Sequence, residues 1–473
     1  MSSISPNDEL NEYGYSQKFI RTIKSFDSFA VAFSFISITT GIFATFGYLI
    51  NTGGPRGLWT WPIVILGQYF VAMIYGALSS RLPLAGYSYQ WGTRLAGWKT
   101  GWWLGWISMC FLFIVVVSVD YAFVQVAFQP LIGQTYTPMS AAIETAITIA
   151  IQGIIIFVST KTTAKLNSAA VVTEVAGIVV LVLALVIGAV VKDHGSVSNI
   201  FSTGVVPTEG YWKWIGPFML STLLGAYTIV GFEAASNLAE ETDNARKVIP
   251  NSMTRAVALS GIMGFILLLG ASFAISDMEA TAKSSAPIAF LVEQNLGTVA
   301  TKILLFIVCI SIFACGMINL MTNTRLIYAM GRDGRLPGHK SLSQAPKPTG
   351  GPSWATAVAT IVSISIVLLL SNSTNALTTL FSASTIMPAL AYLGTVILFI
   401  RVRKNLKPGE HGVEKKSWEM PVAILAVIWL VFELSCLIFP PQFRNAQYYV
   451  LGTLLVGVVF FVIASIQKKS QDK

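Results

Sequence analysis

The five-residue stretch Ser37-Ile38-Thr39-Thr40-Gly41 interrupts an otherwise aliphatic run early in the chain. A second stretch, Thr228-Ile229-Val230-Gly231-Phe232-Glu233, interrupts a later run in the same way, and its glycine follows the first by 190 residues. If such runs cross a membrane, a break persists only beside a cavity or a ligand, because lipid cannot satisfy the freed backbone N–H and C=O groups. Interrupted helices at matching places in two halves of a chain favour a shared binding site.

Apolar runs of helix length follow one another along the whole sequence. The 473 residues are 54% hydrophobic and only 11% charged, whereas soluble domains carry about 25% charged residues. A membrane-spanning helix needs roughly 20 mostly apolar residues. Twelve runs meet this length, over residues 27–50, 58–80, 100–128, 138–158, 166–191, 214–238, 255–276, 300–330, 353–371, 376–400, 419–439 and 446–466. None alternates like a membrane β-strand, so we predict an all-α protein of twelve transmembrane helices.

Basic residues gather before the first run and after every even-numbered run. These positions hold 25 of the 31 Lys and Arg residues, and the net charge is +9. Because basic loops stay in the cytoplasm, the bias predicts a multi-pass protein of the plasma or inner membrane with both termini cytoplasmic. The basic excess therefore reports topology, and we expect lipid but no nucleic acid as a partner. Residues 1–25 are polar and do not resemble a signal peptide.

The spacing of the two breaks predicts an internal repeat. Five runs separate the starts of the two interrupted runs, and an odd number of spans inverts the second copy relative to the first. Close packing of membrane helices also uses Gly, Ser and Thr, which is the alternative interpretation of either break alone. The expected parts are a cytoplasmic N-terminal segment (1–25), a first repeat (26–191), a second repeat (213–401), two further helices (419–467) and a cytoplasmic tail (468–473).

Several motifs resemble the amino acid–polyamine–organocation (APC) superfamily over nearly the whole chain. Thr39-Thr40-Gly41-Ile42-Phe43 resembles its first broken helix, and residues 231–236, followed by 240–242 and 246–250, resemble its sixth. Residues 323–337 are similar to the end of its eighth helix. Gly53-Gly54-Pro55, with two nearby tryptophans, resembles the branch that carries amino acids, GABA, choline and related amines. The resemblance implies a LeuT-type fold of two inverted five-helix repeats plus two helices, with helices 1 and 6 discontinuous.

The resemblance also implies a substrate site at the two breaks. Backbone N–H groups of the first break would bind a substrate carboxylate, as helix N-termini bind anions. Carbonyl groups of the second break would face an amine, and Tyr227 would cover the substrate as an aromatic gate. Asn319 is a polar residue within the apolar eighth run and would line the pocket. The predicted substrate-binding residues are Ile38, Thr39, Thr40, Gly41, Tyr227, Val230, Gly231 and Asn319.

Two acidic residues inside the predicted spans are candidates for coupling. Placing an ionised side chain at the centre of a membrane helix costs about 2.5–3.5 kcal/mol, so the presence of each acid calls for a functional or structural explanation. Glu174 stands where some family members carry a basic residue in place of a coupling sodium ion. The reversed charge, together with burial that favours a neutral carboxyl, makes Glu174 a candidate proton carrier. Glu233 follows the second break and either holds the unwound segment or titrates. The alternative for both is an acid that only braces neighbouring helices.

Four other acids have simpler interpretations. Asp27 is expected to cap the first helix, and Glu433 lies outside both repeats. Asp120 and Glu144 are expected near the ends of their runs, where they would reach the membrane surface or line a vestibule. Residues 278–295 are expected to form an external loop with a short helix.

These observations favour a secondary transporter that takes up a small amino acid or related amine with a proton as symported ion. A carrier of polyamine or choline, or a substrate exchanger, is the alternative. A channel or receptor is a different class, and the sequence has neither a selectivity filter nor a ring of like charges. There is no phosphate-binding Gly-x-x-x-x-Gly-Lys motif for ATP, and no zinc motif, so we expect no enzyme activity, metal or cofactor. The surplus of acids favours a cationic substrate, whereas the first break suits a carboxylate.

Overall fold

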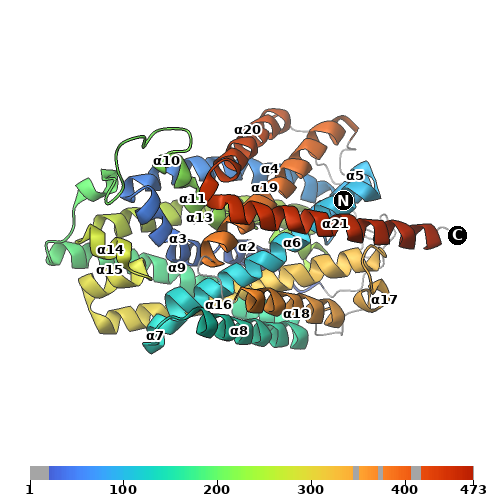
Figure 1. The fold of residues 1–473 in the computed structure, drawn as a ribbon. Helices are drawn as coiled ribbons and strands as arrows, with labels where there is room; N and C mark the ends of the chain where they lie inside the picture. Colours follow the sequence, from blue (N-terminus) through green and yellow to red (C-terminus); the bar gives the residue numbers. More distant parts are fainter. Residues whose placement is uncertain (1–20, 345–350, 371–375, 406–416, 472–473) are drawn as a thin grey trace.

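A computed structural model describes residues 21–344, 351–370, 376–405 and 417–471 of the chain. The described part is a bundle of helices without a named β-strand, and ten of its helical segments are long and apolar enough to cross a membrane (Figure 1). The prediction of an all-α membrane protein is therefore confirmed. The predicted terminal segments lie largely outside the described residues, which begin at 21 and end at 471.

In the first half of the chain, the helices lie close to the predicted runs. The connecting elements are the 3-10 helices η1 (Pro55–Thr60) and η3 (Val197–Phe201) and the helix α5 (Tyr87–Ala96). The third run continues from α6 into a π-helix, η2 (Phe123–Phe128), and then into α7 (Gln129–Ile132). The main helices are α2 (Ser25–Ile36), α3 (Ile38–Thr52), α4 (Trp61–Arg81), α6 (Trp98–Ala122), α8 (Pro138–Val158) and α9 (Thr160–Val191).

In the second half, the sixth predicted run is divided into α10 (Pro217–Leu220), α11 (Thr222–Thr228) and α12 (Ala234–Asn237), followed by η4 (Ala239–Glu241). The ninth run forms α18 (Ser353–Leu369), a helix of 17 residues. These two runs are therefore not among the ten long segments. The remaining main helices are α13 (Ala245–Phe273), α16 (Thr298–Arg332), α19 (Ala376–Val402), α20 (Glu419–Ile438) and α21 (Arg444–Gln471).

Short helices lie at both ends of the bundle. The expected external loop forms two of them, α14 (Met278–Lys283) and α15 (Pro287–Leu296). They lie at the end opposite to α5 and α17 (His339–Leu342) in Figure 1. Two 3-10 turns, η5 (Arg403–Asn405) and η6 (Pro441–Phe443), flank α20.

Local capping explains where several helices begin. Thr137 accepts a hydrogen bond from the backbone N–H of Ser140 at the start of α8, and Pro138 occupies the first helical position, where its missing N–H costs nothing. The predicted cap at Asp27 is confirmed, because its Oδ2 accepts from the backbone N–H of Lys24, 3.3 Å away, at the start of α2. Its Oδ1 accepts from Ser168 Oγ of α9 at 2.7 Å. The cap therefore also joins two spans.

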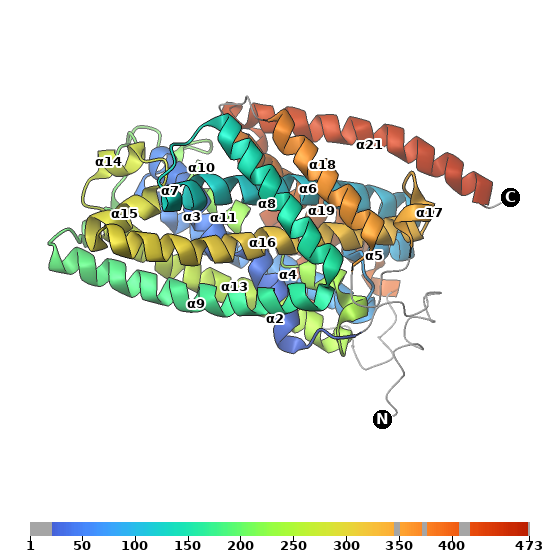
Figure 2. The same cartoon turned by 90° about the horizontal axis from the view of Figure 1, so that it is seen from below.

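The third span lies at the centre of the bundle and the last span at its edge. In the most apolar part of Trp98–Ile132, 94% of the residues are buried, compared with 17% for Pro441–Lys468. Figure 2 shows α21 along one edge of the bundle and α9 along the opposite edge. The segments α2–α3 and α11 lie inside, where α3 packs against α11 and α16. All four cysteines are free.

The Gly53-Gly54-Pro55 motif forms the turn between α3 and η1 and is tied to the segment before α10. The hydroxyl of Tyr211 donates a hydrogen bond to the carbonyl oxygen of Gly53, 2.7 Å away. Arg56 lies 5.6 Å from the centre of the same ring. Burial raises the pKa of Tyr211 to about 12, although the charge of Arg56 acts in the opposite direction. The hydroxyl is therefore neutral and remains a donor at physiological pH.

Candidate functional site

The first helix is broken at a single residue, Ser37. It has φ 35° and ψ 94°, so α2 ends at Ile36 and α3 begins at Ile38. Positive φ is uncommon for a residue other than glycine and marks local strain. The break is therefore shorter than the predicted stretch of residues 37–41, because residues 38–41 form the first turn of α3. The N–H of Gly41 donates to the carbonyl oxygen of Ser37, 2.9 Å away, and this bond already closes a helical turn.

Glu174 of α9 binds directly at the break. One carboxylate oxygen, Oε1, accepts hydrogen bonds from Ser37 Oγ and from the backbone N–H of Thr39, each at 3.0 Å. The N–H of Thr40 donates to Ser37 Oγ at 3.2 Å. The positive end of α3 therefore holds a carboxylate from the chain itself, in the place predicted for a substrate carboxylate. The structure brings Glu174 to the first break.

The second break covers the residues between Thr228 and Ala234, one residue shorter than predicted. Gly231 has φ 82°, and its N–H donates to the hydroxyl of Tyr392 at 2.9 Å. The same hydroxyl donates to Glu233 Oε2 at 2.7 Å. Tyr392 of α19 therefore holds both the unwound backbone and the acid beside it. The sequence analysis did not identify Tyr392, because nothing near it in the sequence indicates this pairing.

The carbonyl oxygens of Tyr227 and Val230 remain available at this break. Neither accepts a hydrogen bond from the part of the chain that the structure describes. The last turn of α11 cannot use the first of them, since the N–H of Gly231 is bound to Tyr392. Both oxygens can therefore accept from a ligand.

The two breaks lie against each other. A Cβ atom at Gly41 would collide with the side chain of Thr228, and one at Gly231 would collide with the ring of Phe35. Glycine is required at both positions because a side chain of the other broken helix lies where a Cβ atom would be. We call the residues around both breaks the break region: Ser37, Thr39, Gly41, Glu174, Tyr227, Thr228, Gly231, Glu233 and Tyr392.

Tyr227 and Asn319 both lie in the interior beside the breaks. The hydroxyl of Tyr227 is 2.9 Å from Ser118 Oγ, and its ring centre is 4.6 Å from that of Phe381. Asn319 is fully buried, and its Nδ2 is 3.8 Å from Cys315 Sγ. The thiol of Cys315 donates to the carbonyl oxygen of Phe35, the freed end of α2, at 3.4 Å.

Asp120 is not in a vestibule, and this prediction was wrong. Its side chain is fully buried, and Oδ1 accepts from Gln152 Nε2 at 2.7 Å. The reason is that α6 lies at the centre of the bundle, where α16, α19 and α8 pack against it. Glu144 does lie near the start of α8 and accepts from Gln129 and Gln134.

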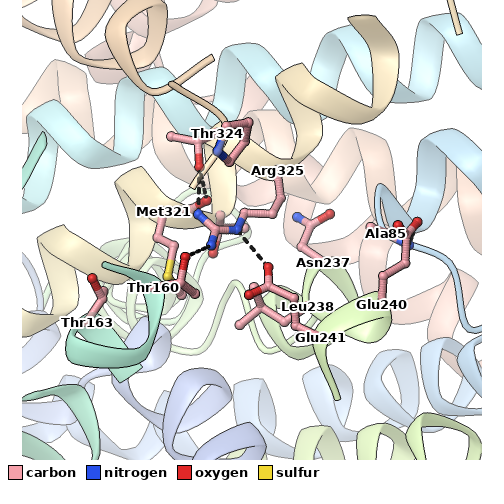
Figure 3. A network of polar contacts seen from close by, with 12 residues as sticks. Ala85, Thr160, Thr163, Asn237, Leu238, Glu240, Glu241, Met321, Thr324 and Arg325 are labelled. Atoms are coloured by element: carbon pink, nitrogen blue, oxygen red, sulfur yellow. Dashed lines mark hydrogen bonds and ion pairs between the residues drawn. The ribbon is translucent and has the colours of Figure 1, made fainter. Parts of the chain in front are cut away.

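Paired charges gather at the end of the bundle that holds α5 and α17. Arg325 Nε lies 3.1 Å from Glu241 Oε1, and its two other nitrogens donate to Thr160 and Thr324 (Figure 3). Arg332 pairs with Glu240 at 3.0 Å. We call this set the arginine cluster: Arg325, Arg332, Glu240, Glu241 and Thr160.

The arginine cluster joins several segments. The N–H groups of Thr22 and Ile23, before α2, both donate to the carbonyl oxygen of Glu241 at 3.0 Å. The backbone N–H of Gly86, before α5, donates to Asn237 Oδ1 at 2.9 Å. The start of the first span, the α12–η4 segment and the end of α16 are therefore held together at this end.

The comparisons with known proteins agree with this geometry. The family model described as amino acid permease matches residues 23–461. This chain belongs to the amino acid permease family. The Arabidopsis thaliana protein named amino-acid permease BAT1 is 28% identical over 454 residues, which cover 89% of this chain and 86% of the relative. An uncharacterized amino-acid permease of Schizosaccharomyces pombe is 26% identical over 484 residues, which cover 98% of this chain and 86% of the relative.

A rice homologue of BAT1 is 26% identical over 451 residues, which cover 89% of this chain and 85% of the relative. The predicted membership of the APC superfamily is therefore confirmed. The permease is a multi-pass membrane transporter and not an enzyme.

Proposed function

We propose that the permease is a secondary active transporter that takes up a small amino acid or related amine by alternating access, together with a proton. One observation carries the proposal. Glu174, an acid on α9, binds the N-terminus of half-helix α3 through Ser37 and Thr39. The carboxyl of Glu174, which can gain or lose a proton, thereby contacts the same backbone N–H groups that could bind a substrate carboxylate.

The proton and the substrate favour each other at this site. Hydrogen bonds to an ionised carboxylate are roughly twice as strong as bonds between neutral groups. Protonation of Glu174 therefore weakens its bonds to Ser37 and Thr39. The N–H of Thr39 and the positive end of α3 are then free for a substrate carboxylate, while Tyr227 and Val230 offer carbonyl oxygens to its amine. By linkage, bound substrate favours the protonated acid to the same extent.

A LeuT-type arrangement supports alternating access in this proposal. It comprises inverted repeats over 26–191 and 213–401 and two further helices over 419–467. Discontinuous helices in the first and sixth runs support it, as does the close contact between the two breaks. The arginine cluster closes one end of the bundle, and separation of its pairs would open that end.

We place the arginine cluster and both termini on the cytoplasmic side of the plasma or inner membrane. The concentration of Lys and Arg in alternate connections supports this orientation. The names of the relatives support an amino acid as the substrate. A carrier of organic cations, or an exchanger, is the second candidate, favoured by Glu174 and Glu233, two buried acids that form no ion pair with the described residues. A channel or receptor is less favoured, because the two breaks pack against each other.

The decisive experiment measures amino acid uptake into proteoliposomes at several external pH values. Uptake by the wild type should fall as the pH rises, by up to about tenfold per pH unit where an essential acid loses its proton. Glu174→Gln should fold normally and lose this dependence. Glu433→Gln is the matched control, since it alters another buried acid, bound to Gln68, away from the breaks. A wild-type pH profile in Glu174→Gln contradicts proton coupling through Glu174.

A further inference from the structure

Asp120 carries a buried carboxylate oxygen that has no partner. Oδ1 accepts from Gln152, but Oδ2 has no hydrogen-bond partner and no access to solvent. Among the described residues, it is the one carboxylate oxygen in this condition. A buried polar atom without a partner calls for a physical explanation, such as a ligand or ion that binds there.

Two further acceptor oxygens near Asp120 also lack a donor. Gln152 Nε2 donates to Asp120 Oδ1 and to the carbonyl oxygen of Phe313 at 3.2 Å, which fixes the orientation of the amide. Its Oε1 is buried without a partner, and so is Asn319 Oδ1. A Cβ atom at Gly316 would collide with Asp120 Oδ1. Asn319 follows Gly316 by three positions and lies on the same face of α16.

No basic side chain of the described residues pairs with these oxygens. The fully buried basic side chains of the described part are Arg81 and Arg325. Arg81 pairs with Glu419 and Arg325 with Glu241. Ser118, which precedes Asp120 on α6, instead lies 2.9 Å from the hydroxyl of Tyr227 through its Oγ, and Cys315, next to Gly316, donates to the carbonyl oxygen of Phe35. Asp120 therefore lies beside the break region, where it pairs with no basic side chain of the described part.

We infer that Asp120 determines substrate specificity by binding a cationic N–H group of the substrate. Three acceptor oxygens without donors suit an ammonium or guanidinium group, which brings several N–H donors and no acceptor. A quaternary ammonium has no N–H to offer and does not satisfy them. The inference rests on the proposed function and names its substrate class, a basic amino acid or a polyamine. In a basic amino acid, the α-carboxylate would bind at α3 and the side-chain cation at Asp120.

The test compares a cationic and a neutral substrate in one preparation. Counterflow of radiolabelled arginine and of alanine is measured in proteoliposomes for the wild type, Asp120→Asn and Glu433→Gln. Loss of a charged hydrogen-bond partner should lower arginine counterflow about ten- to hundredfold in Asp120→Asn. Alanine counterflow should be unchanged, and Glu433→Gln should keep the wild-type ratio of the two rates. Thermal stabilisation of the purified protein by arginine should disappear in Asp120→Asn, a readout that also detects a misfolded variant.

Several outcomes would overturn the inference. These are an equal loss for both substrates, no loss for either, or a wild type that carries alanine but no cationic substrate. Arginine counterflow that requires sodium ions, with the requirement abolished by Asp120→Asn, would make Asp120 an ion ligand instead. In each case the wild type still transports an amino acid, so the proposed function stands. A wild type that carries neither amino acids nor amines removes the proposed function itself.

Discussion

The buried acids of the arginine cluster and those of the break region have different kinds of partner. Glu240 and Glu241 each pair with an arginine, at 3.0 and 3.1 Å. Glu174 and Glu233 accept only from neutral donors, namely a serine, a backbone N–H and a tyrosine. A buried ion pair is costly to break, because the remaining partner keeps an uncompensated charge. An acid held by neutral donors can instead gain or lose a proton while its neighbours stay in place. The first region is suited to holding segments together and the second to changing state.

The largest effect should come from breaking an ion pair of the arginine cluster. Arg325→Ala leaves Glu241 buried without a partner and should destabilise the permease by about 3–5 kcal/mol. Thermal unfolding in detergent measures this loss. The double variant Arg325→Met with Glu241→Gln removes both charges and should recover much of the stability. Equal stability of Arg325→Ala and the wild type would show that the cluster does not hold this end together.

A smaller effect is expected at the second break. Tyr392→Phe removes the hydroxyl between Gly231 and Glu233, which leaves a buried N–H and a carboxyl without their partner. The expected cost is about 1–3 kcal/mol of stability, below that of Arg325→Ala. The same unfolding assay checks it, with Tyr449→Phe, an exposed tyrosine on α21, as the control. A loss as large as that of Arg325→Ala would contradict the distinction between the two regions.

The smallest effect on stability, but a clear effect on binding, is expected for the aromatic gate. Tyr227→Ala removes the ring over the proposed site and should weaken substrate binding about tenfold, which corresponds to about 1.4 kcal/mol. Tyr227→Phe loses only the bond to Ser118 and should bind nearly as well as the wild type. Substrate titration of the purified protein distinguishes the two. Unchanged affinity in Tyr227→Ala would exclude Tyr227 as the gate.

Features that depend on local composition were predictable from the sequence. The predicted run 138–158 and the helix Pro138–Val158 coincide, because length and apolarity decide a span. The second break was predicted to within one residue, since Gly231 adopts a backbone conformation that favours glycine. The first break was predicted too long because one strained serine is enough to end α2, and the threonines after it tolerate a helix.

Features that depend on distant contacts were not predictable. Arg325 and Glu241 are 84 residues apart, and Tyr392 and Glu233 are 159 apart. Each residue was visible in the sequence, but a single sequence holds no information on which ones meet. Asp120 was misplaced for a related reason, since its burial depends on the helices around α6.

The contact between the two breaks has a mechanical consequence. The side chain of Thr228 packs on Gly41, and the ring of Phe35 packs on Gly231. Each broken helix therefore places a side chain where the other has a glycine. A tilt of α3 alone would either drive it into α11 or leave an empty volume, which costs about 24 cal/mol per Å³. We therefore expect the two broken helices to move as one body, and a rigid crosslink between them to leave transport intact.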